Sequence, residues 1–221
     1  MPSPRTQAEL ADVDDPAWPE LEASIKESQV PVEVVSIPPD QGRTVLHQLQ
    51  VTARSTLGAL ALNTGGVLID HGWLRILGGG SQDLPSLATA SNLDSAGEGS
   101  GPLGYVTVAF DVLGGHFAID SGGLGLDYGK VCYWGPDTLK WSSLGVGPST
   151  FVDWALSKEG LASFYKDLRW EGWQDEVKGV ALSQGITVFP FLFTAEAYPV
   201  ANASRRVVPF HEVLAFSKGK P

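Results

Sequence analysis

Short apolar segments separated by turn residues constrain the fold more than any other feature of this 221-residue sequence. Their apolar residues alternate with other residues, which is typical of strands with one buried face. Such closely spaced strands pair antiparallel, because parallel neighbours need a long crossover. We therefore expect an α+β fold built on an antiparallel β-meander. The predicted strands contain Val106 to Val112, Phe117 and Ile119, Val131 and Tyr133, and Leu139 and Trp141.

Segments on both sides of this central region have helical periodicity. Residues 42–63 predict one helix that Gly58 divides, and residues 151–168 predict one or two helices interrupted at Gly160. A short acidic helix is expected within 170–179, and a final helical turn begins at Pro209. These helices are expected to back the meander.

Three further strand predictions and one tail complete the outline. The segments 32–37, 66–77 and 186–193 are rich in β-branched and aromatic residues, and the first reads as an edge strand bounded by prolines. Residues 1–18 are rich in Pro, Asp and Ala and predict a flexible acidic arm. Residues 19–221 then form a single α+β domain.

Charge and cysteine content exclude several classes of function. The 15 basic and 25 acidic residues give a net charge of -10, the wrong sign for tracking nucleic acid. The same charge suits a basic protein partner, or it serves only solubility. Cys132 is the only cysteine, so there is no intramolecular disulfide or Cys-rich zinc site. With no secretory signal and no membrane-length apolar stretch, we expect a cytoplasmic protein that does not bind membranes.

Two groups of residues are candidates for contact with a partner protein. Aromatic anchors with acidic neighbours are common in protein interfaces, which favours a binding surface for both groups. The alternatives are that the tryptophans belong to the core and that the carboxylates form a solvated helix face. The first group is Trp134, Asp137 and Trp141; the second is Asp167, Trp170, Glu171 and Trp173.

Catalysis has one candidate centre. His116 lies between Asp111 and Asp120 in sequence, close to glycines 122–129, and an imidazole oriented by a carboxylate can act as a general base. The alternative is a strand histidine satisfied by its neighbours. There is no G-x-S-x-G nucleophile, no local metal-ligand spacing among the four histidines, and no phosphate-binding motif in the glycine loop. We therefore expect no cofactor, no metal and no enzyme activity.

The stretch LNTGGVLIDHGWLRILGGGS and the region from GYVTVAFDVLGGHFAID through YWGPDTLKW to FVDWAL resemble a bacterial family of unknown function that is similar to the SUKH superfamily. The resemblance covers residues 57–170. It implies a meander backed by helices and a protein-binding role, since SUKH proteins are known chiefly as immunity proteins that neutralise partner toxins.

Together these features predict a protein-binding module, with immunity-like neutralisation of a basic toxin as its specific form. A small enzyme that uses His116 is the first alternative, and an adaptor whose tails make the contacts is the second. The sequence specifies neither the partner nor the oligomeric state.

Overall fold

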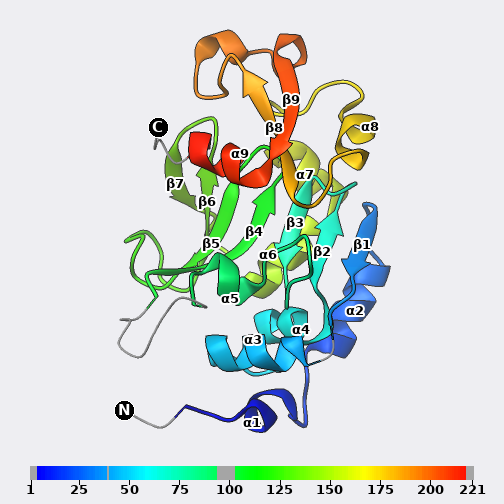
Figure 1. Cartoon of the computed structure of the whole chain (residues 1–221), viewed down its shortest axis with the longest axis vertical. Helices are drawn as coiled ribbons and strands as arrows, with labels where there is room; N and C mark the ends of the chain where they lie inside the picture. The colour runs from blue at the N-terminus through cyan, green and yellow to red at the C-terminus, as the bar shows by residue number, and fades with distance from the viewer. Residues whose placement is uncertain (1–3, 39, 94–102, 218–221) are drawn as a thin grey trace.

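The computed structural model describes residues 4–38, 40–93 and 103–217. Its centre is a seven-stranded antiparallel sheet in which the strand order follows the chain, so each strand pairs with the next (Figure 1). This arrangement confirms the predicted α+β class and the antiparallel meander. The strands are β1 (Val32–Val35), β2 (Gly66–Ile69), β3 (Leu74–Leu77), β4 (Tyr105–Asp111), β5 (His116–Asp120), β6 (Val131–Gly135) and β7 (Lys140–Ser143).

The strand register places one row of cross-strand neighbours across the whole sheet. We call this set the β row, and its members share one face because directly paired residues point to the same side. Helix α9 (Phe210–Ser217) packs on this face, with the ring of Phe210 5.3 Å from that of Phe110. A two-stranded sheet of β8 (Gln184–Phe189) and β9 (Ser204–Pro209) lies beyond one end of the large sheet (Figure 1). The β row is Glu33, Leu68, Arg75, Phe110, His116, Trp134 and Trp141.

Two helices, α6 (Pro148–Ala155) and α7 (Lys158–Phe164), cover the opposite face of the sheet (Figure 1). Phe117 of β5 packs on Phe151 of α6 with 5.1 Å between ring centres. Tyr133 of β6 meets Phe164 of α7 edge to face at 4.9 Å. The aromatic residues predicted for these helices thus build the core on this side.

The other helices lie around the sheet, and α1, α3 and α4 occupy the end opposite β8 and β9 (Figure 1). Among the described residues, no helix has the length and apolar character needed to cross a membrane. These helices are α1 (Gln7–Ala11), α2 (Trp18–Lys26), α3 (Gln41–Leu49), α4 (Thr56–Asn63), α5 (Leu87–Ala90) and α8 (Trp173–Lys178), with short 3-10 turns at Ala195–Ala197 and Val200–Asn202.

Both predicted helix interruptions were misplaced. The first helical segment breaks where Gln50 adopts a left-handed conformation (φ 54°), and Gly58 lies inside α4. The second breaks at Ser157, whose side chain accepts the N–H of Gly160 and caps α7. In both places a cap or turn outside the helix, and not the glycine, sets the boundary.

The described part of the N-terminal segment is not a loose arm. Thr6 and Glu9 form a capping box that starts α1, and Leu10 is completely buried in the core. The backbone N–H of Ala53 donates to the Leu10 carbonyl at 2.9 Å, which fastens α1 to the chain before α4. The prediction missed this because the partners of Leu10 are distant in sequence.

The strand predicted over 186–193 ends at Phe189, immediately before Pro190, and its partner β9 was not predicted. The polar loop predicted over residues 91–104 lies mostly outside the described residues.

Candidate functional site

Aromatic side chains are exposed where the chain leaves β8 and returns to β9. Phe189 is 66% exposed, Phe193 45% and Tyr198 39%. Phe191 lies between the first two, with its ring 6.0 Å from Phe189 and stacked on Phe193 at 5.4 Å. We call these four residues the aromatic ridge; they follow β8 at one end of the molecule (Figure 1). Clustered exposed aromatics are typical of interaction surfaces, because isolated exposed apolar groups are the usual pattern elsewhere.

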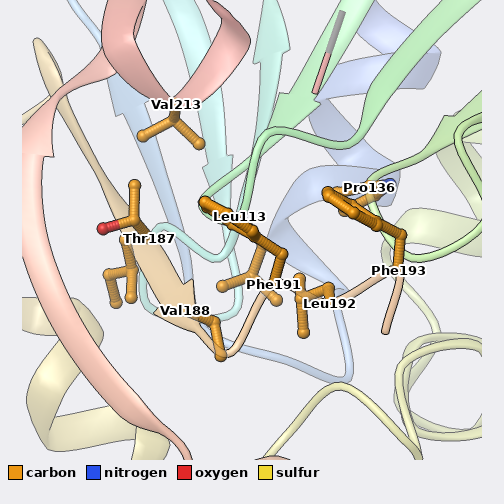
Figure 2. A pocket seen from close by; sticks show the side chains of 9 residues that line it. Leu113, Pro136, Thr187, Val188, Phe191, Leu192, Phe193 and Val213 are labelled. Carbon is orange, nitrogen blue, oxygen red and sulfur yellow. The ribbon is translucent and has the colours of Figure 1, made fainter. Parts of the chain in front are cut away.

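A small apolar notch connects the ridge to the central sheet. Figure 2 shows Phe191 and Phe193 beside Leu113 and Pro136, around a volume of about 40 Å³. Leu113 comes from the β4–β5 turn and Pro136 from the turn after β6. The Tyr-Trp-x-Pro-Asp motif therefore reaches the ridge through its proline.

Two predicted contact residues place negative charge beside the ridge. Partial burial is the main cause that raises the pKa of the Tyr198 hydroxyl, and the charges of Asp137 and Asp167 raise it further. Both carboxylates are thus close enough to act on this tyrosine. Asp137 and Asp167, which we call the acidic rim, come from segments far apart in sequence that the fold brings to one place.

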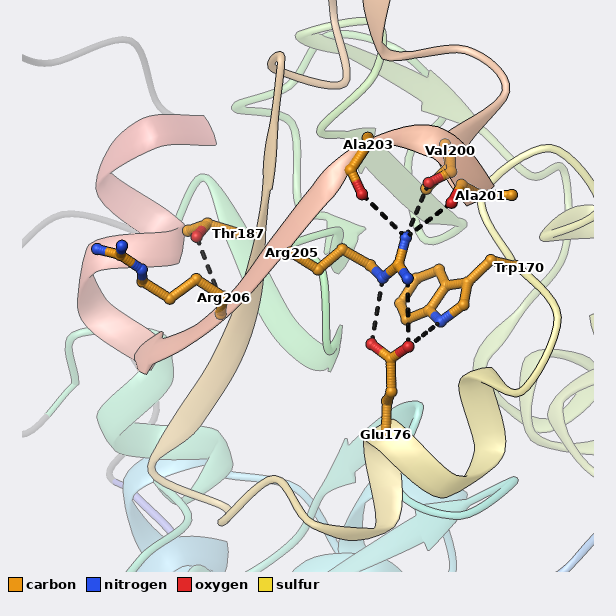
Figure 3. Close-up of polar contacts among 8 residues, drawn as sticks. All are labelled: Trp170, Glu176, Thr187, Val200, Ala201, Ala203, Arg205 and Arg206. Atoms are coloured by element: carbon orange, nitrogen blue, oxygen red, sulfur yellow. Dashed lines mark hydrogen bonds and ion pairs between the residues drawn. The ribbon is translucent and has the colours of Figure 1, made fainter.

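An arginine clasp holds the ridge-bearing loop to helix α8 (Figure 3). Arg205 of β9 donates to both carboxylate oxygens of Glu176, at 3.1 and 3.2 Å, and to the carbonyls of Val200 and Ala203. Trp170 donates its indole N–H to the same carboxylate at 2.8 Å. The clasp fixes the residues immediately after Tyr198, so it positions the ridge.

Trp170 and Trp173 do not serve as exposed anchors, contrary to the prediction for an aromatic helix face. Their exposed fractions are 5% and 8%, and both rings pack against Trp73, at 5.8 and 5.0 Å. Arg169 lies over the Trp173 ring at 4.0 Å and pairs with Asp70 at 2.8 Å. Only the acidic residues of this predicted group, Asp167 and Glu171, are exposed.

Trp134 and Trp141 are partly buried and belong to the β row. They are direct cross-strand partners, with ring centres 5.9 Å apart. The ring of Trp141 also lies 5.0 Å from that of His116. The contacts described for these two rings are therefore within the sheet.

The three residues of the predicted catalytic centre have different surroundings. His116 is 4% exposed and its Nε2 lies 2.9 Å from the Thr107 hydroxyl. Asp120 accepts backbone N–H groups from four residues of the glycine loop, at positions 122, 124, 126 and 127. That carboxylate therefore holds the bend of the loop. None of the three lines the cavities described here.

Asp111 is buried on the face of the sheet opposite His116. The hydroxyls of Tyr133 and Tyr165 donate to its Oδ2 at 3.0 and 3.2 Å, and the backbone N–H groups of Leu113 and Gly115 donate to Oδ1. Burial raises the pKa of Asp111 to about 6, although these hydrogen bonds oppose the rise. The group organises the core and has no route to a substrate through the cavities described.

Metal binding has no candidate among the described residues, since no group of three His, Cys, Asp or Glu side chains is placed to hold an ion. The aromatic ridge and the clasp were not predicted from the sequence. Three phenylalanines within five residues, interrupted by Pro190, were a usable signal for the ridge, because a proline-broken segment is seldom a central strand. For Arg205 the sequence offered no comparable signal.

Residues 7–213 match the model of the family described as "Protein of unknown function DUF2625". The chain belongs to this family. A relative in Escherichia coli, the putative uncharacterized protein YbfG, is 39% identical over 191 residues, which is 86% of each chain. An uncharacterized protein of Haemophilus influenzae is 34% identical over 204 residues, covering 92% of this chain and 85% of the relative. No solved structure matches. The DUF2625 assignment confirms the predicted bacterial family of unknown function.

Proposed function

We propose that this protein is a binding module that neutralises a basic protein partner, which it contacts through the aromatic ridge and the acidic rim. The exposure of the ridge, above all of Phe189 at 66%, is the observation that carries this proposal. Aromatic side chains supply a large contact area at low entropic cost and are enriched among the residues that dominate binding energy.

The charge of this protein indicates that the partner is basic. The net charge of -10 and the position of Asp137 and Asp167 beside Tyr198 favour a surface rich in Lys and Arg. Complementary charge accelerates encounter and disfavours acidic competitors, while the rings contribute most of the affinity. Arg205 of the clasp is paired with Glu176 and adds little opposing charge.

The resemblance of residues 57–170 to SUKH proteins supports neutralisation as the purpose of binding, and membership of that superfamily is part of the proposal. A cytoplasmic location is also part of it. Cys132 is buried and unpaired, which fits a reducing compartment.

The experiment compares capture by three forms of the full-length chain from lysate of the source cells, at low and moderate salt. The forms are the natural protein, a ridge variant carrying Phe189→Ser and Phe193→Ser, and a control carrying Leu126→Ser and Tyr128→Ser. The control residues are 46% and 79% exposed and lie on the glycine loop, so the change in exposed apolar surface is matched.

We expect one protein of positive net charge to be retained by the natural and control forms and lost from the ridge variant. With that partner purified, the ridge variant should bind about 100-fold more weakly, as for two truncated interface anchors. Asp137→Asn should mainly slow association and reduce its salt dependence. Equal affinity of the ridge and natural forms, or a partner without positive charge, would refute the proposal.

A further inference from the structure

Arg75 is a buried cation in an otherwise apolar strand, Leu74–Leu77. It is 2% exposed. Its Nη1 donates to the carbonyls of Leu182 and Gln184 at 2.9 and 2.6 Å, and its Nε donates to the carbonyl of Gly72 at 3.4 Å. Burial lowers the pKa of Arg75 to about 10, while the charge of Asp111 opposes that shift, so the guanidinium is still protonated at neutral pH.

No carboxylate pairs directly with this charge. Among the described residues, no Asp or Glu oxygen lies within 4.0 Å of the Arg75 guanidinium, and Nη2 has no hydrogen-bond partner. Arg169 provides a contrast within the same fold, because it is similarly enclosed and pairs with Asp70 at 2.8 Å. An unpaired buried charge is costly, so its retention calls for a counter-ion.

The Arg75 side chain lines a surface cavity of about 460 Å³ between β1, the β2–β3 turn and the segment after α8. His71 and Lys178 line the same cavity, and Glu33 is its one acidic residue. Gly72 has a φ of 83°, and a side chain there would meet nothing within 4 Å, so the turn leaves the space open. Apolar residues make up much of the remaining lining; these are Val32, Leu68, Val177, Val180 and Leu182.

We propose that this cavity binds a small ligand that has one oxyanion group, a carboxylate or a phosphate, on an apolar body. The oxyanion group accepts hydrogen bonds from the free N–H groups of Arg75. The planar guanidinium suits either a carboxylate or a phosphate. Lys178, which lies 3.3 Å from Asp175 of the same helix, is the second cation of the wall, and the apolar residues hold the body of the ligand. The volume is in the range of small-molecule sites. This site is separate from the aromatic ridge and does not depend on the function proposed above.

Nuclear magnetic resonance titration of the full chain tests the site. The probes are inorganic phosphate and butyrate, each added at constant ionic strength against chloride. We expect at least one probe to cause saturable shifts in the Arg75 Nε–H signal and in the backbone amides of His71 and Gly72. Saturation by phosphate alone assigns a phosphate ligand, and saturation by butyrate alone assigns a carboxylate.

Two variants localise the binding without disturbing the buried arginine. Lys178→Gln should lower the affinity for the probe about fivefold, in line with the loss of one exposed charge. Ala181→Trp places a large ring at an exposed position in the cavity lining and should abolish binding. Lys166→Gln is the control, because Lys166 lines a neighbouring cavity and should leave affinity unchanged.

Two results would overturn the proposal. One is the absence of saturable shifts at Arg75 with both probes. The other is binding that is equal in the natural and Ala181→Trp forms, because the probe would then occupy a different place.

Discussion

The guanidinium carbon of Arg205 lies 4.3 Å from the ring centre of Trp170. Both side chains donate hydrogen bonds to Glu176, so strand β9 and helix α8 share one polar contact over a buried ring. A two-stranded sheet is marginal by itself and depends on what it packs against. The clasp is therefore expected to matter more to β8 and β9 than an ordinary surface ion pair.

Replacing Arg205 tests this dependence. Arg205→Ala removes the cation–π contact and the side-chain hydrogen bonds to the carbonyls of Val200 and Ala203. We expect the free energy of unfolding in urea to fall by about 2 kcal/mol, a value that allows for the partial exposure of Glu176. Arg206→Ala, at an exposed position of the same strand, should change it by less than about 0.5 kcal/mol. Equal effects of the two variants would argue against the clasp.

Asp111 predicts an unusual dependence of stability on pH. Its pKa is about 6 in the folded chain, whereas an ordinary aspartate has a pKa of 3.8, so between these values the folded state binds more protons than the unfolded state. Stability therefore falls as pH rises from 4 to 7, by up to about 3 kcal/mol from this group. Asp111→Asn should remove that part of the dependence. Urea unfolding of both forms across this range measures it, and a difference that is constant with pH would contradict the assignment.

For Asp120, the predicted dependence of stability on pH has the opposite sign. Burial acts to raise its pKa, but the backbone N–H groups of Leu126, Gly122 and two other loop residues together lower it below the ordinary value. Its stabilising effect is present above the unfolded pKa and is lost as pH falls through the folded pKa.

Hydrogen exchange of the glycine loop is the measurement for Asp120. In Asp120→Asn at neutral pH, the amides of Gly122 and Leu126 should exchange faster than in the natural protein. The difference in exchange rate between the two forms should disappear in acid, once the carboxylate of the natural protein is protonated. Asp83→Asn, at an exposed position, is the control and should not alter the loop. Unchanged exchange in Asp120→Asn would show that the carboxylate does not hold the glycine loop.

The meander was predictable because its information is local. Alternation with a period of two and frequent turn residues identify both the strands and their antiparallel order. The β row then follows from the register. The burial of Leu10 was not predictable in the same way, since it depends on a contact with Ala53, 43 positions later in the chain.

The candidate site shows the same division between local and distant information. Asp137 and Asp167 were identified as acidic residues, but their proximity to Tyr198 depends on three separate segments. Trp170 and Trp173 have the composition of an interface anchor, yet Trp73 supplies a buried partner for both rings. Composition identifies residues capable of binding, and only the fold decides which of them remain exposed.

Gly58 lies inside α4, and its close packing predicts an effect on stability that is opposite to the one expected from helix propensity. Alanine is favoured over glycine inside a helix by about 1 kcal/mol, so Gly58→Ala in α4 would ordinarily stabilise the protein. Here the added Cβ would overlap the carbonyl oxygen of Thr52 and lie 2.6 Å from its carbonyl carbon. Backbone atoms in the turn before α4 cannot move aside as a flexible side chain would.

We therefore expect Gly58→Ala to lower the free energy of unfolding by about 2 kcal/mol, the usual range for an overpacked site. Ser163→Ala, at an exposed position of α7, introduces the same residue type without a clash and should change stability by less than about 0.5 kcal/mol. Urea unfolding of the two variants beside the natural protein gives the comparison. A gain in stability for Gly58→Ala would contradict the prediction. It would mean that the backbone of Thr52 leaves room for the added methyl group, and that helix propensity determines the stability at this position.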